Sequence, residues 1–408
     1  MAERADAERS DVRGLRPIAV ALGVLLALAA CTDRGADDRA ARAGFHSPSA
    51  GTPAPSPVPS GPFGTARWSG EPVPTGALLH DDGRTLWSIA LDGGRSAVWR
   101  HPEAFVHRVA ASEDGRRVAL AVTRGDDRSL GPEDPSAFLY VLEPDGSVRT
   151  VDVVDDYRVI EAPTFLRPPT TPRGPERVYW IRFADGIDDR GRLETDVMVD
   201  DGGPRRVALP LRFAEGVIDV YGYPGASRFS VTLFRQNDVP TRFEILRNDD
   251  EGRSTDAALT LWGNNEPRAQ TDSGVGVAWI SPTDYVIPVV HEFFARGYTL
   301  RRFRVGCEAM GSEVVYRGTG IDRGYEEVPW QLLPAGARRV LVLRSADVRR
   351  IADGRAAFAR WHTIDLRSGR LIETSITWRP GEGGWTWVAP ASRANDEGRC
   401  EGIDWRFP

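Results

Sequence analysis

Hydrophobic and polar residues alternate in short runs from about residue 75 onward, and glycine-containing turns separate these runs. Alternation with a period of two is typical of a β-strand with one buried face. An apolar run followed by Asp-Gly predicts a β-hairpin, because glycine accepts the positive φ of a tight turn. Six runs with turns recur roughly every 50–60 residues: 86–91 before Asp92-Gly93, 138–142 before Asp145-Gly146, 197–199 before Asp201-Gly202, 243–246 before Gly252, 300–305 before Gly306, and 361–366 before Ser368-Gly369.

A second, weaker half-repeat falls between these runs. Residues 109–120 form its clearest copy, which reads as a strand, a tight turn and a strand. Looser copies pair 162–165 with 177–181, 277–282 with 285–287, and 329–332 with 339–343. No amphipathic helix of three turns is predicted; the nearest candidate, 346–360, is interrupted by Gly354. The pattern therefore predicts an all-β fold of six repeated units, with seven as the alternative.

One turn of the half-repeat carries a family resemblance. Residues 112–119, Ser-Glu-Asp-Gly-Arg-Arg-Val-Ala, resemble the Ser-Pro-Asp-Gly-Arg-x-Ile-Ala signature of TolB-like β-propeller repeats. Residues 139–141, followed by Asp145-Gly146, are similar to the strand and turn that come next in that family. The resemblance covers about residues 76–390 and implies a six-bladed or seven-bladed β-propeller that acts as an interaction platform. Propellers often close by pairing strands from both ends of the chain, and 76–80 and 384–388 are the candidates.

The first thirty residues predict export. An apolar run from Ile18 follows Arg13 and Arg16 and ends in Leu-Ala-Ala-Cys, which resembles a bacterial lipobox with lipidation at Cys31. The alternative is an uncleaved N-terminal helix or a buried apolar segment, because residues 1–17 carry no net positive charge. Residues 47–60 are rich in proline and nearly free of large apolar side chains, which is typical of a disordered tether. We expect a signal peptide over 1–30, a tether over 31–72 and a propeller over 73–408.

Cysteine and charge usage refine this picture. With Cys31 lipidated, Cys307 and Cys400 remain as a possible disulfide in an oxidising compartment, the alternative being two buried thiols. The net charge is −6, all fixed side-chain cations are arginines, and we read those arginines as unclustered along the chain. A mildly acidic chain without a concentrated basic face argues against a nucleic-acid partner.

Motifs for chemistry are absent from the sequence. There is no Gly-x-Ser-x-Gly elbow, and the six histidines show no ligand spacing typical of a metal site. The acidic pairs 155–156, 188–189 and 249–250 are adjacent in sequence, which favours turns over a pair of catalytic carboxyls. We therefore expect no catalytic residues, no metal and no cofactor.

One segment has the composition of a binding loop. Residues 291–298 combine aromatic side chains with both charges, and aromatic residues with arginine are enriched at binding hot spots. The candidate binding residues are His291, Glu292, Phe293, Phe294, Arg296 and Tyr298. The alternative is a hairpin whose aromatic rings belong to the core, as we also expect for Trp262, Trp330 and Trp385.

These observations predict a lipid-anchored binding or scaffold module on the outer face of the cytoplasmic membrane. Its expected partner is an envelope protein or a cell-wall component, and its body is expected to be monomeric. One alternative is an envelope glycan-acting enzyme with carboxylates from several blades on one face. The other is a small-ligand receptor that uses the central channel.

Overall fold

The described part of the protein consists of β-strands and one short helix. The computed structural model describes residues 61–123, 137–154, 159–167, 174–187, 193–207, 215–226, 228–235, 240–247, 255–260, 277–290, 298–305, 307, 312–318, 329–379 and 384–389. All of them belong to one compact unit, residues 50–408.

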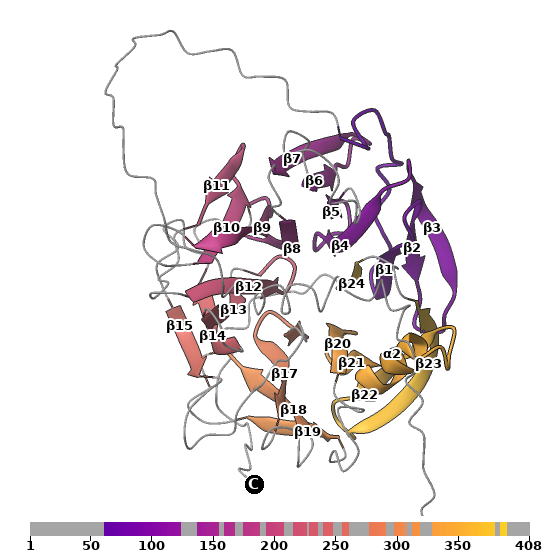
Figure 1. Ribbon diagram of the computed structural model, residues 1–408, viewed down its shortest axis with the longest axis vertical. Helices are drawn as coiled ribbons and strands as arrows, with labels where there is room; N and C mark the ends of the chain where they lie inside the picture. The colour runs from indigo at the N-terminus through magenta and orange to yellow at the C-terminus, as the bar shows by residue number, and fades with distance from the viewer. Residues whose placement is uncertain are drawn as a thin grey trace, which may run out of the picture. The chain divides into compact units, whose positions relative to one another are not determined.

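The strands form six antiparallel sheets of four strands each (Figure 1). We number the sheets in chain order and write each from its innermost to its outermost strand. Sheet 1 is β24 (Trp385–Val388), β1 (Ala77–Asp81), β2 (Thr85–Ile89) and β3 (Arg95–Arg100); sheet 2 is β4 (Phe105–Ala111), β5 (Val118–Thr123), β6 (Ala137–Leu142) and β7 (Val148–Val154); sheet 3 is β8 (Val159–Leu166), β9 (Arg177–Ile187), β10 (Leu193–Asp200) and β11 (Pro204–Arg206). Sheet 4 is β12 (Glu215–Gly222), β13 (Arg228–Arg235), β14 (Pro240–Arg247) and β15 (Thr255–Thr260); sheet 5 is β16 (Ala278–Trp279), β17 (Asp284–Val290), β18 (Tyr298–Arg304) and β19 (Glu313–Arg317); sheet 6 is β20 (Pro329–Pro334), β21 (Arg339–Arg344), β22 (Ala359–Asp365) and β23 (Arg370–Trp378).

The innermost strands close the sheets into a ring. Each innermost strand contacts the innermost strands of the two neighbouring sheets, and β20 contacts β24, which contacts β4. β24 comes from the C-terminal part of the chain and pairs antiparallel with β1, with Ala77 opposite Val388 and His80 opposite Trp385. The protein is an all-β propeller, and the predicted closure between 76–80 and 384–388 is confirmed.

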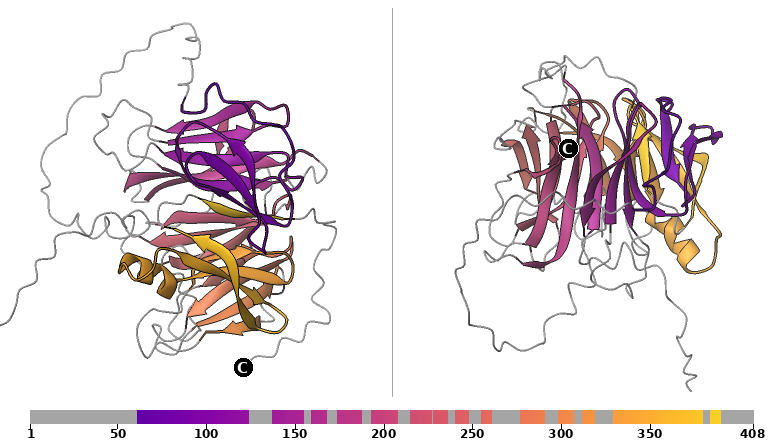
Figure 2. Two further views of the ribbon diagram at one scale, coloured as in Figure 1. Left: turned by 90° about the vertical axis from the view of Figure 1, so that its right-hand side faces the viewer. Right: turned by 90° about the horizontal axis from the view of Figure 1, so that it is seen from above.

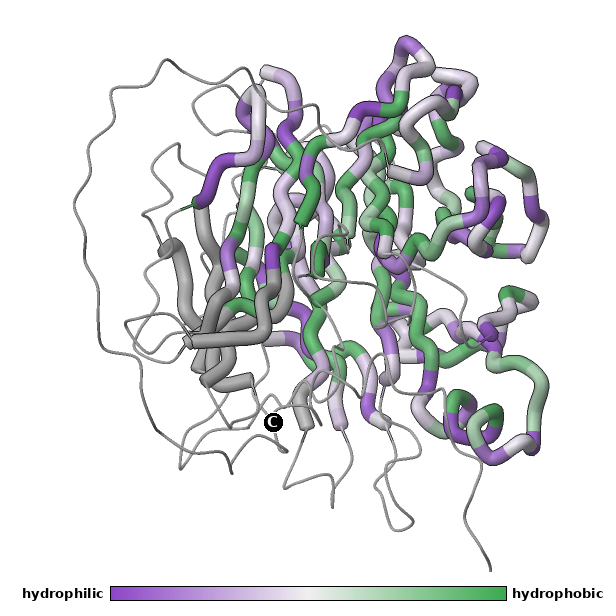
Figure 3. Tube along the Cα trace, turned by 45° about the horizontal axis from the view of Figure 1, so that its top comes forward, coloured by the Kyte–Doolittle hydropathy of each residue, from purple (hydrophilic) through white to green (hydrophobic). Residues whose placement is uncertain are grey.

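Burial explains why the middle strands read as continuous apolar runs. Both faces of a sheet in the ring are covered by neighbouring sheets, so β6 is buried at every position and β5 at all but its last. The outermost strands β3 and β11 are mostly exposed. Hydrophobic residues accordingly concentrate in the strands and hydrophilic ones in the links at their ends (Figure 3).

The predicted turns join the third and fourth strands of their sheets. Gly93, Gly146, Gly202 and Gly369 all have positive φ and lie between β2 and β3, β6 and β7, β10 and β11, and β22 and β23. Gly252 and Gly306 lie outside the described residues. The half-repeats at 109–120, 162–181, 277–287 and 329–343 match the first and second strands of sheets 2, 3, 5 and 6.

The helix α2 (Ser345–Ala352) lies between the second and third strands of sheet 6 and extends beyond the strand ends (Figure 2). It buries Val348 and is followed by Asp353 and by Gly354 at φ +67°. The interruption that the sequence predicts at Gly354 therefore ends a helix of about two turns.

The chain packs against the propeller before its first strand, along residues 61–73, which we name the N-terminal strap. Phe63 is fully buried. Its ring centroid lies 5.1 Å from that of Trp99 in sheet 1 and 5.0 Å from that of Tyr140 in sheet 2. Trp68 and Val73 are buried as well. The packed body thus starts before residue 73, where the sequence analysis ends the tether.

Two turn glycines let the strap approach closely. The Trp68 N–H donates to the carbonyl of Gly146 at 3.2 Å, and the Val73 N–H donates to the carbonyl of Gly115 at 2.8 Å. A Cβ at Gly146 would lie 2.9 Å from the Trp68 carbonyl oxygen, and one at Gly115 2.6 Å from that of Val73. Glycine is therefore favoured at these turns for two reasons: it adopts the positive φ, and it lacks the Cβ that would clash with the strap.

A buried ion pair lies beneath Phe63. The His101 Nε2 is 2.7 Å from Asp81 Oδ2, with both side chains shielded from solvent. The His101 Nδ1 lies 2.7 Å from the carbonyl oxygen of Pro102, so both ring nitrogens face acceptors, as suits an imidazolium. Burial lowers the pKa of His101, whereas the hydrogen bond and the charge of Asp81 raise it. The raising effects together outweigh burial, so the pKa of His101 is raised from 6.5.

We expect this pair to make stability depend on pH above 6.5. A histidine with a raised pKa in the folded state contributes stability that is complete below 6.5 and is lost as pH rises through its folded pKa. The free energy of unfolding of the wild type should therefore fall between pH 6.5 and 9 relative to that of His101→Gln, measured by denaturant titration. Parallel curves over that range would contradict the raised pKa.

Candidate functional site

The antiparallel order of the strands gives the propeller two distinct faces. Links between first and second strands, and between third and fourth strands, lie at one end, which we name the turn face. Links between second and third strands, and between consecutive sheets, lie at the other end, which we name the loop face. The turns 112–117 and 143–147 belong to the turn face, and α2 belongs to the loop face.

The predicted binding loop lies between β17 and β18 in the sequence, and the described strand ends that flank it, Val290 and Tyr298, lie at the loop face. His291, Glu292, Phe293, Phe294 and Arg296 lie outside the described residues. Tyr298 begins β18, is 3% exposed and packs against Tyr316 with ring centroids 5.9 Å apart. Tyr298 is therefore a core residue, and the binding role of 291–297 stays a prediction.

The other predicted positions divide between the core and the regions that are not described. Cys31 and Cys400 lie outside the described residues, as do Trp262 and the three acidic pairs. Cys307 is 1% exposed, and its pairing with Cys400 stays a prediction. Trp385 is buried in the core and Trp330 packs against the same cluster, as expected.

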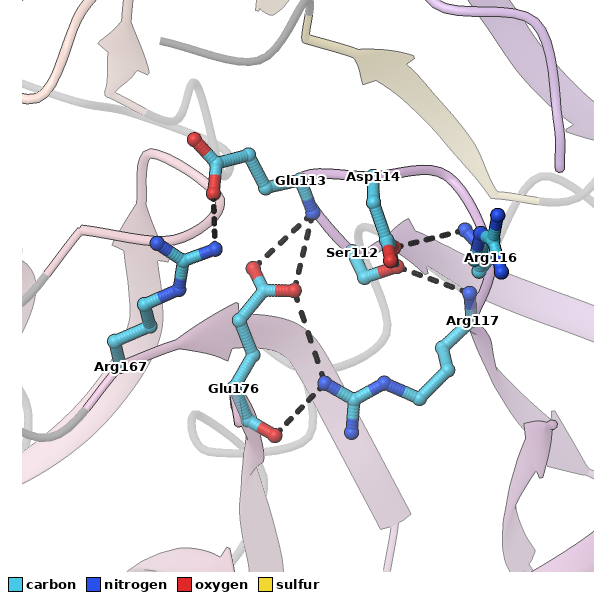
Figure 4. A network of polar contacts seen from close by, with 7 residues as sticks. All are labelled: Ser112, Glu113, Asp114, Arg116, Arg117, Arg167 and Glu176. Atoms are coloured by element: carbon cyan, nitrogen blue, oxygen red, sulfur yellow. Dashed lines mark hydrogen bonds and ion pairs between the residues drawn. The ribbon is translucent and has the colours of Figure 1, made fainter. Parts of the chain in front are cut away.

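The turn that carries the family resemblance is rigidly hydrogen-bonded. Ser112 Oγ donates to Asp114 Oδ1 at 2.7 Å and accepts from the Arg117 N–H at 2.9 Å. Asp114 Oδ1 also accepts from the Arg116 N–H at 3.0 Å. These bonds fix the backbone of the β4–β5 turn and hold Glu113 in place at its tip (Figure 4).

Glu113 differs from the proline that the resembling signature has at this position. Its backbone N–H donates to both carboxylate oxygens of Glu176, at 3.1 and 3.2 Å. Proline has no N–H and could not make this contact. This contact connects the turn of sheet 2 to the link between β8 and β9 in sheet 3.

Two arginines complete this acid–arginine cluster of Glu113, Arg117, Arg167 and Glu176 (Figure 4). Arg167 Nη2 donates to Glu113 Oε2, and Arg117 Nη2 donates to the Glu176 carbonyl at 2.8 Å. The same Arg117 nitrogen lies 3.7 Å from Glu176 Oε2. Each sheet thus offers a carboxylate to an arginine of the other.

Burial dominates the electrostatics of Glu176, which is 6% exposed. Burial raises the pKa of Glu176 to about 7, although the Glu113 N–H, Arg117 and Arg167 lower it, and the Glu113 carboxylate raises it further. Glu176 therefore carries a proton over part of the neutral range, where an ordinary glutamate is ionised.

A third sheet touches the cluster through the β12–β13 link. A Cβ at Gly225 would lie 2.6 Å from Glu113 Oε2, and the Arg167 N–H donates to the Ala226 carbonyl at 3.0 Å. Tyr223 is buried beside them, and burial together with the Glu113 charge raises the pKa of its phenol to about 12. The cluster thus joins sheets 2, 3 and 4 at the turn face.

A second polar group lies between the innermost strands β4 and β8. The His107 Nε2–H donates to the Ile160 carbonyl at 2.7 Å, and Arg108 Nε lies 2.9 Å from Glu161 Oε2. Burial lowers the pKa of His107, which keeps the ring neutral. Arg108 lies on β4 and Glu161 on β8, and their charges neutralise each other. We therefore interpret this polar group as a link between the two strands.

Within the described residues, no set of three or more metal-ligating side chains converges, and no helix is long and apolar enough to cross a membrane. The acid–arginine cluster is the most elaborate polar site of the turn face that the structure describes. Sequence reasoning missed Arg117, Arg167 and Glu176 as partners. The one sequence feature that could have pointed to this cluster is Glu113, which occupies the position of proline in the signature that the turn resembles.

Comparisons with known proteins found distant similarities among solved structures. No protein-family model and no curated protein matches the sequence. Similar solved structures include a chain of a nidogen–laminin complex, at 11% identity and a TM-score of 0.45, covering 77% of this chain and 99% of that one. A putative TolB from Agrobacterium tumefaciens has 16% identity and a TM-score of 0.40, covering 73% of this chain and 88% of that one. An oligogalacturonate lyase in complex with manganese has 14% identity and a TM-score of 0.40, covering 65% and 70%.

Proposed function

We propose that this protein is a binding module of the cell envelope, anchored through a lipid on Cys31 to the outer face of the cytoplasmic membrane. Its six four-stranded sheets serve as six blades, which the contacts between their innermost strands support. It recognises an envelope protein or a cell-wall component through the loop face, where residues 291–297 combine aromatic and charged side chains. It performs no catalysis of its own.

The observation that carries this proposal is the pairing of the buried carboxylates. Five carboxylates are buried among the described residues, and each forms an ion pair with a cationic side chain or a histidine of the same body. The pairs are Asp81–His101, Glu113–Arg167, Asp152–Arg182, Glu176–Arg117, and Asp284 with Arg302 and Arg304. Several of these pairs join neighbouring sheets, which favours a rigid platform.

The second candidate is a glycan-acting enzyme that uses carboxylates from different sheets. Glu113 and Glu176 come from sheets 2 and 3, and the raised pKa of Glu176 is a property of catalytic acids. A catalytic acid must nevertheless reach its substrate, whereas both carboxylates are buried and bonded to arginines. The geometry therefore favours a structural role for the pair.

A crosslinking pull-down of the full-length protein from native membranes tests the proposal. We expect one envelope protein at nearly equal amounts, lost when residues 291–297 are replaced by a Gly-Ser segment. Tyr298 is left unchanged because it belongs to the core. The matched control replaces Asp201 and Arg205, an exposed ion pair of the turn face.

Two outcomes would contradict this reading. Recovery of the partner by the loop variant at wild-type yield would exclude the loop as the binding site. Turnover of an envelope glycan that Glu176→Gln abolishes, with Asp201 and Arg205 replaced as the inactive-site control, would favour the enzyme.

A further inference from the structure

Sheet 6 reverses the charge of the rest of the protein. Residues 329–379, which form this sheet with α2, contain ten arginines and four carboxylates, a formal charge of +6. The whole chain carries −6, so the remaining residues carry −12. Ten of the 52 arginines lie on this sheet, and its positive charge arises as much from its small number of carboxylates as from its arginines.

The same sheet carries the exposed apolar side chains of the described residues. Phe358 is 37% exposed and Ile372 is 46% exposed, and they are the two large hydrophobic residues in the exposed class. Phe358 directly precedes β22, and Ile372 lies on β23, the outermost strand of the sheet. Arg360 lies over the Phe358 ring, 5.7 Å from its centroid.

Exposed arginines lie at both ends of the sheet. Arg338, Arg367 and Arg370 lie at the turn face, and Arg349 and Arg350 lie on α2 at the loop face. All five are exposed, and none forms a salt bridge with another described residue. β23 has nine residues and so spans roughly 30 Å between the two groups. We name these five arginines, with Phe358 and Ile372, the basic edge.

We propose that the basic edge is a contact surface for an anionic lipid bilayer. Arginines that lie near an anionic leaflet are attracted additively, and scattered positions suffice because the lipid headgroups are mobile. Shallow apolar side chains such as Phe358 and Ile372 enter the headgroup region without a preformed pocket. An acidic protein would need a compact, matched set of cations, whereas these arginines are spread over both ends of the sheet.

This inference rests on the proposed function in one respect. A lipid on Cys31 would keep the body within reach of the leaflet, where even weak attraction orients it. Contact through sheet 6 would place both faces of the propeller roughly perpendicular to the membrane and leave the loop face open to a partner. Val348 of α2 is buried and Ile351 packs against the same core, so the helix contributes its arginines rather than an inserted apolar face.

Vesicle flotation of the full-length Cys31→Ser chain tests the surface without the lipid anchor. The vesicles contain phosphatidylcholine with or without phosphatidylglycerol. We expect binding to the anionic vesicles alone, weakened by high salt. Replacing Arg349, Arg350, Arg367 and Arg370 by glutamine should lower the association constant by about tenfold or more. The matched control replaces Arg84, Arg100, Arg116 and Arg205, which gives the same net charge and should bind as the wild type.

Three results would overturn the proposal. They are equal binding to both kinds of vesicle, an equal loss in the matched control, and binding to soluble polyglutamate without binding to anionic vesicles, which would indicate an acidic protein partner. Thermal unfolding of both variants checks that they are folded. The assay uses neither the anchor nor the partner, so a failed pull-down with intact vesicle binding overturns the proposed function alone.

Discussion

Replacing Phe63 by alanine is expected to lower the free energy of unfolding by about 3–5 kcal/mol, the range for truncating a fully buried phenylalanine. Phe63 lies between aromatic residues of sheets 1 and 2, and Tyr140 and Trp99 both contact its ring. The strap around it is closely seated, because a Cβ at Gly61 would lie 1.9 Å from the Tyr140 hydroxyl oxygen. Guanidinium titration monitored by tryptophan fluorescence measures the change.

The matched control is Phe358→Ala, which removes the same side chain from an exposed position on sheet 6. Its effect should stay within about 0.5 kcal/mol, as for most surface substitutions. If Phe63→Ala behaved like this control, the strap would be a dispensable part of the tether, and the body would begin near residue 73. A loss in the expected range instead makes residues 61–72 part of the folding unit.

The strap also illustrates why its boundary was difficult to predict. The neighbouring residues are rich in proline and serine, and composition averaged over a window of this size indicates disorder. Phe63 and Trp68 are single aromatic residues without a strand period, so periodicity does not identify them as buried. Their burial depends on Trp99 and Tyr140, which are distant in sequence, and only the assembled ring brings these residues together.

The ring itself was largely predictable, because its repeated unit is local. Asp92-Gly93 and Asp145-Gly146 mark hairpins whose strands are adjacent in sequence, and local spacing is sufficient to find them. The closing pair β24–β1 is not local, but its candidates followed from the need to leave no exposed edge. Sheet 4 has no half-repeat in the predicted series, although its first two strands, β12 and β13, pair antiparallel as in the other sheets.

The acid–arginine cluster could not be predicted from spacing. Glu113 and Glu176 are 63 positions apart, and Glu176 belongs to no repeat. Local hydrogen bonds of Ser112 and Asp114 set the turn, and these were visible as a signature. The partner of the turn was not visible, because it depends on how two sheets pack. Polar contacts between neighbouring sheets therefore cannot be predicted from the repeats, which describe each sheet by itself.

The second large effect is expected at this cluster, where Glu176→Gln should make the protein more stable than the wild type above pH 7. Burial raises the pKa of Glu176 from 4.5 to about 7. A carboxyl with a raised folded pKa contributes stability that is complete below 4.5 and is lost as pH rises to 7. A shift of this size corresponds to about 3 kcal/mol, and glutamine, which mimics the protonated form, does not lose it.

The difference between the two proteins isolates Glu176 from the other titrating groups. The stability that His101 contributes to the protein is lost as pH rises above 6.5. The stability that His107 contributes, because its pKa is lowered, is lost as pH falls below 6.5. Both histidines are unchanged in Glu176→Gln, so their contributions cancel when the unfolding free energies are subtracted. The subtracted curve should be near zero at pH 4, should grow between pH 4.5 and 7, and should remain constant above pH 7.

Glu71→Gln is the matched control, because Glu71 is exposed on the strap and contacts no member of the cluster. Its curve should follow that of the wild type. If Glu176→Gln also followed the wild type from pH 4.5 to 7, the Glu176 carboxyl would titrate as it does in water, and Arg117 and Arg167 would offset its burial completely. If the expected curve is found, the joint between sheets 2 and 3 weakens as the pH rises from 4.5 to about 7. In that case the contact between the Glu113 N–H and the Glu176 carboxylate gives the turn face a pH-sensitive joint.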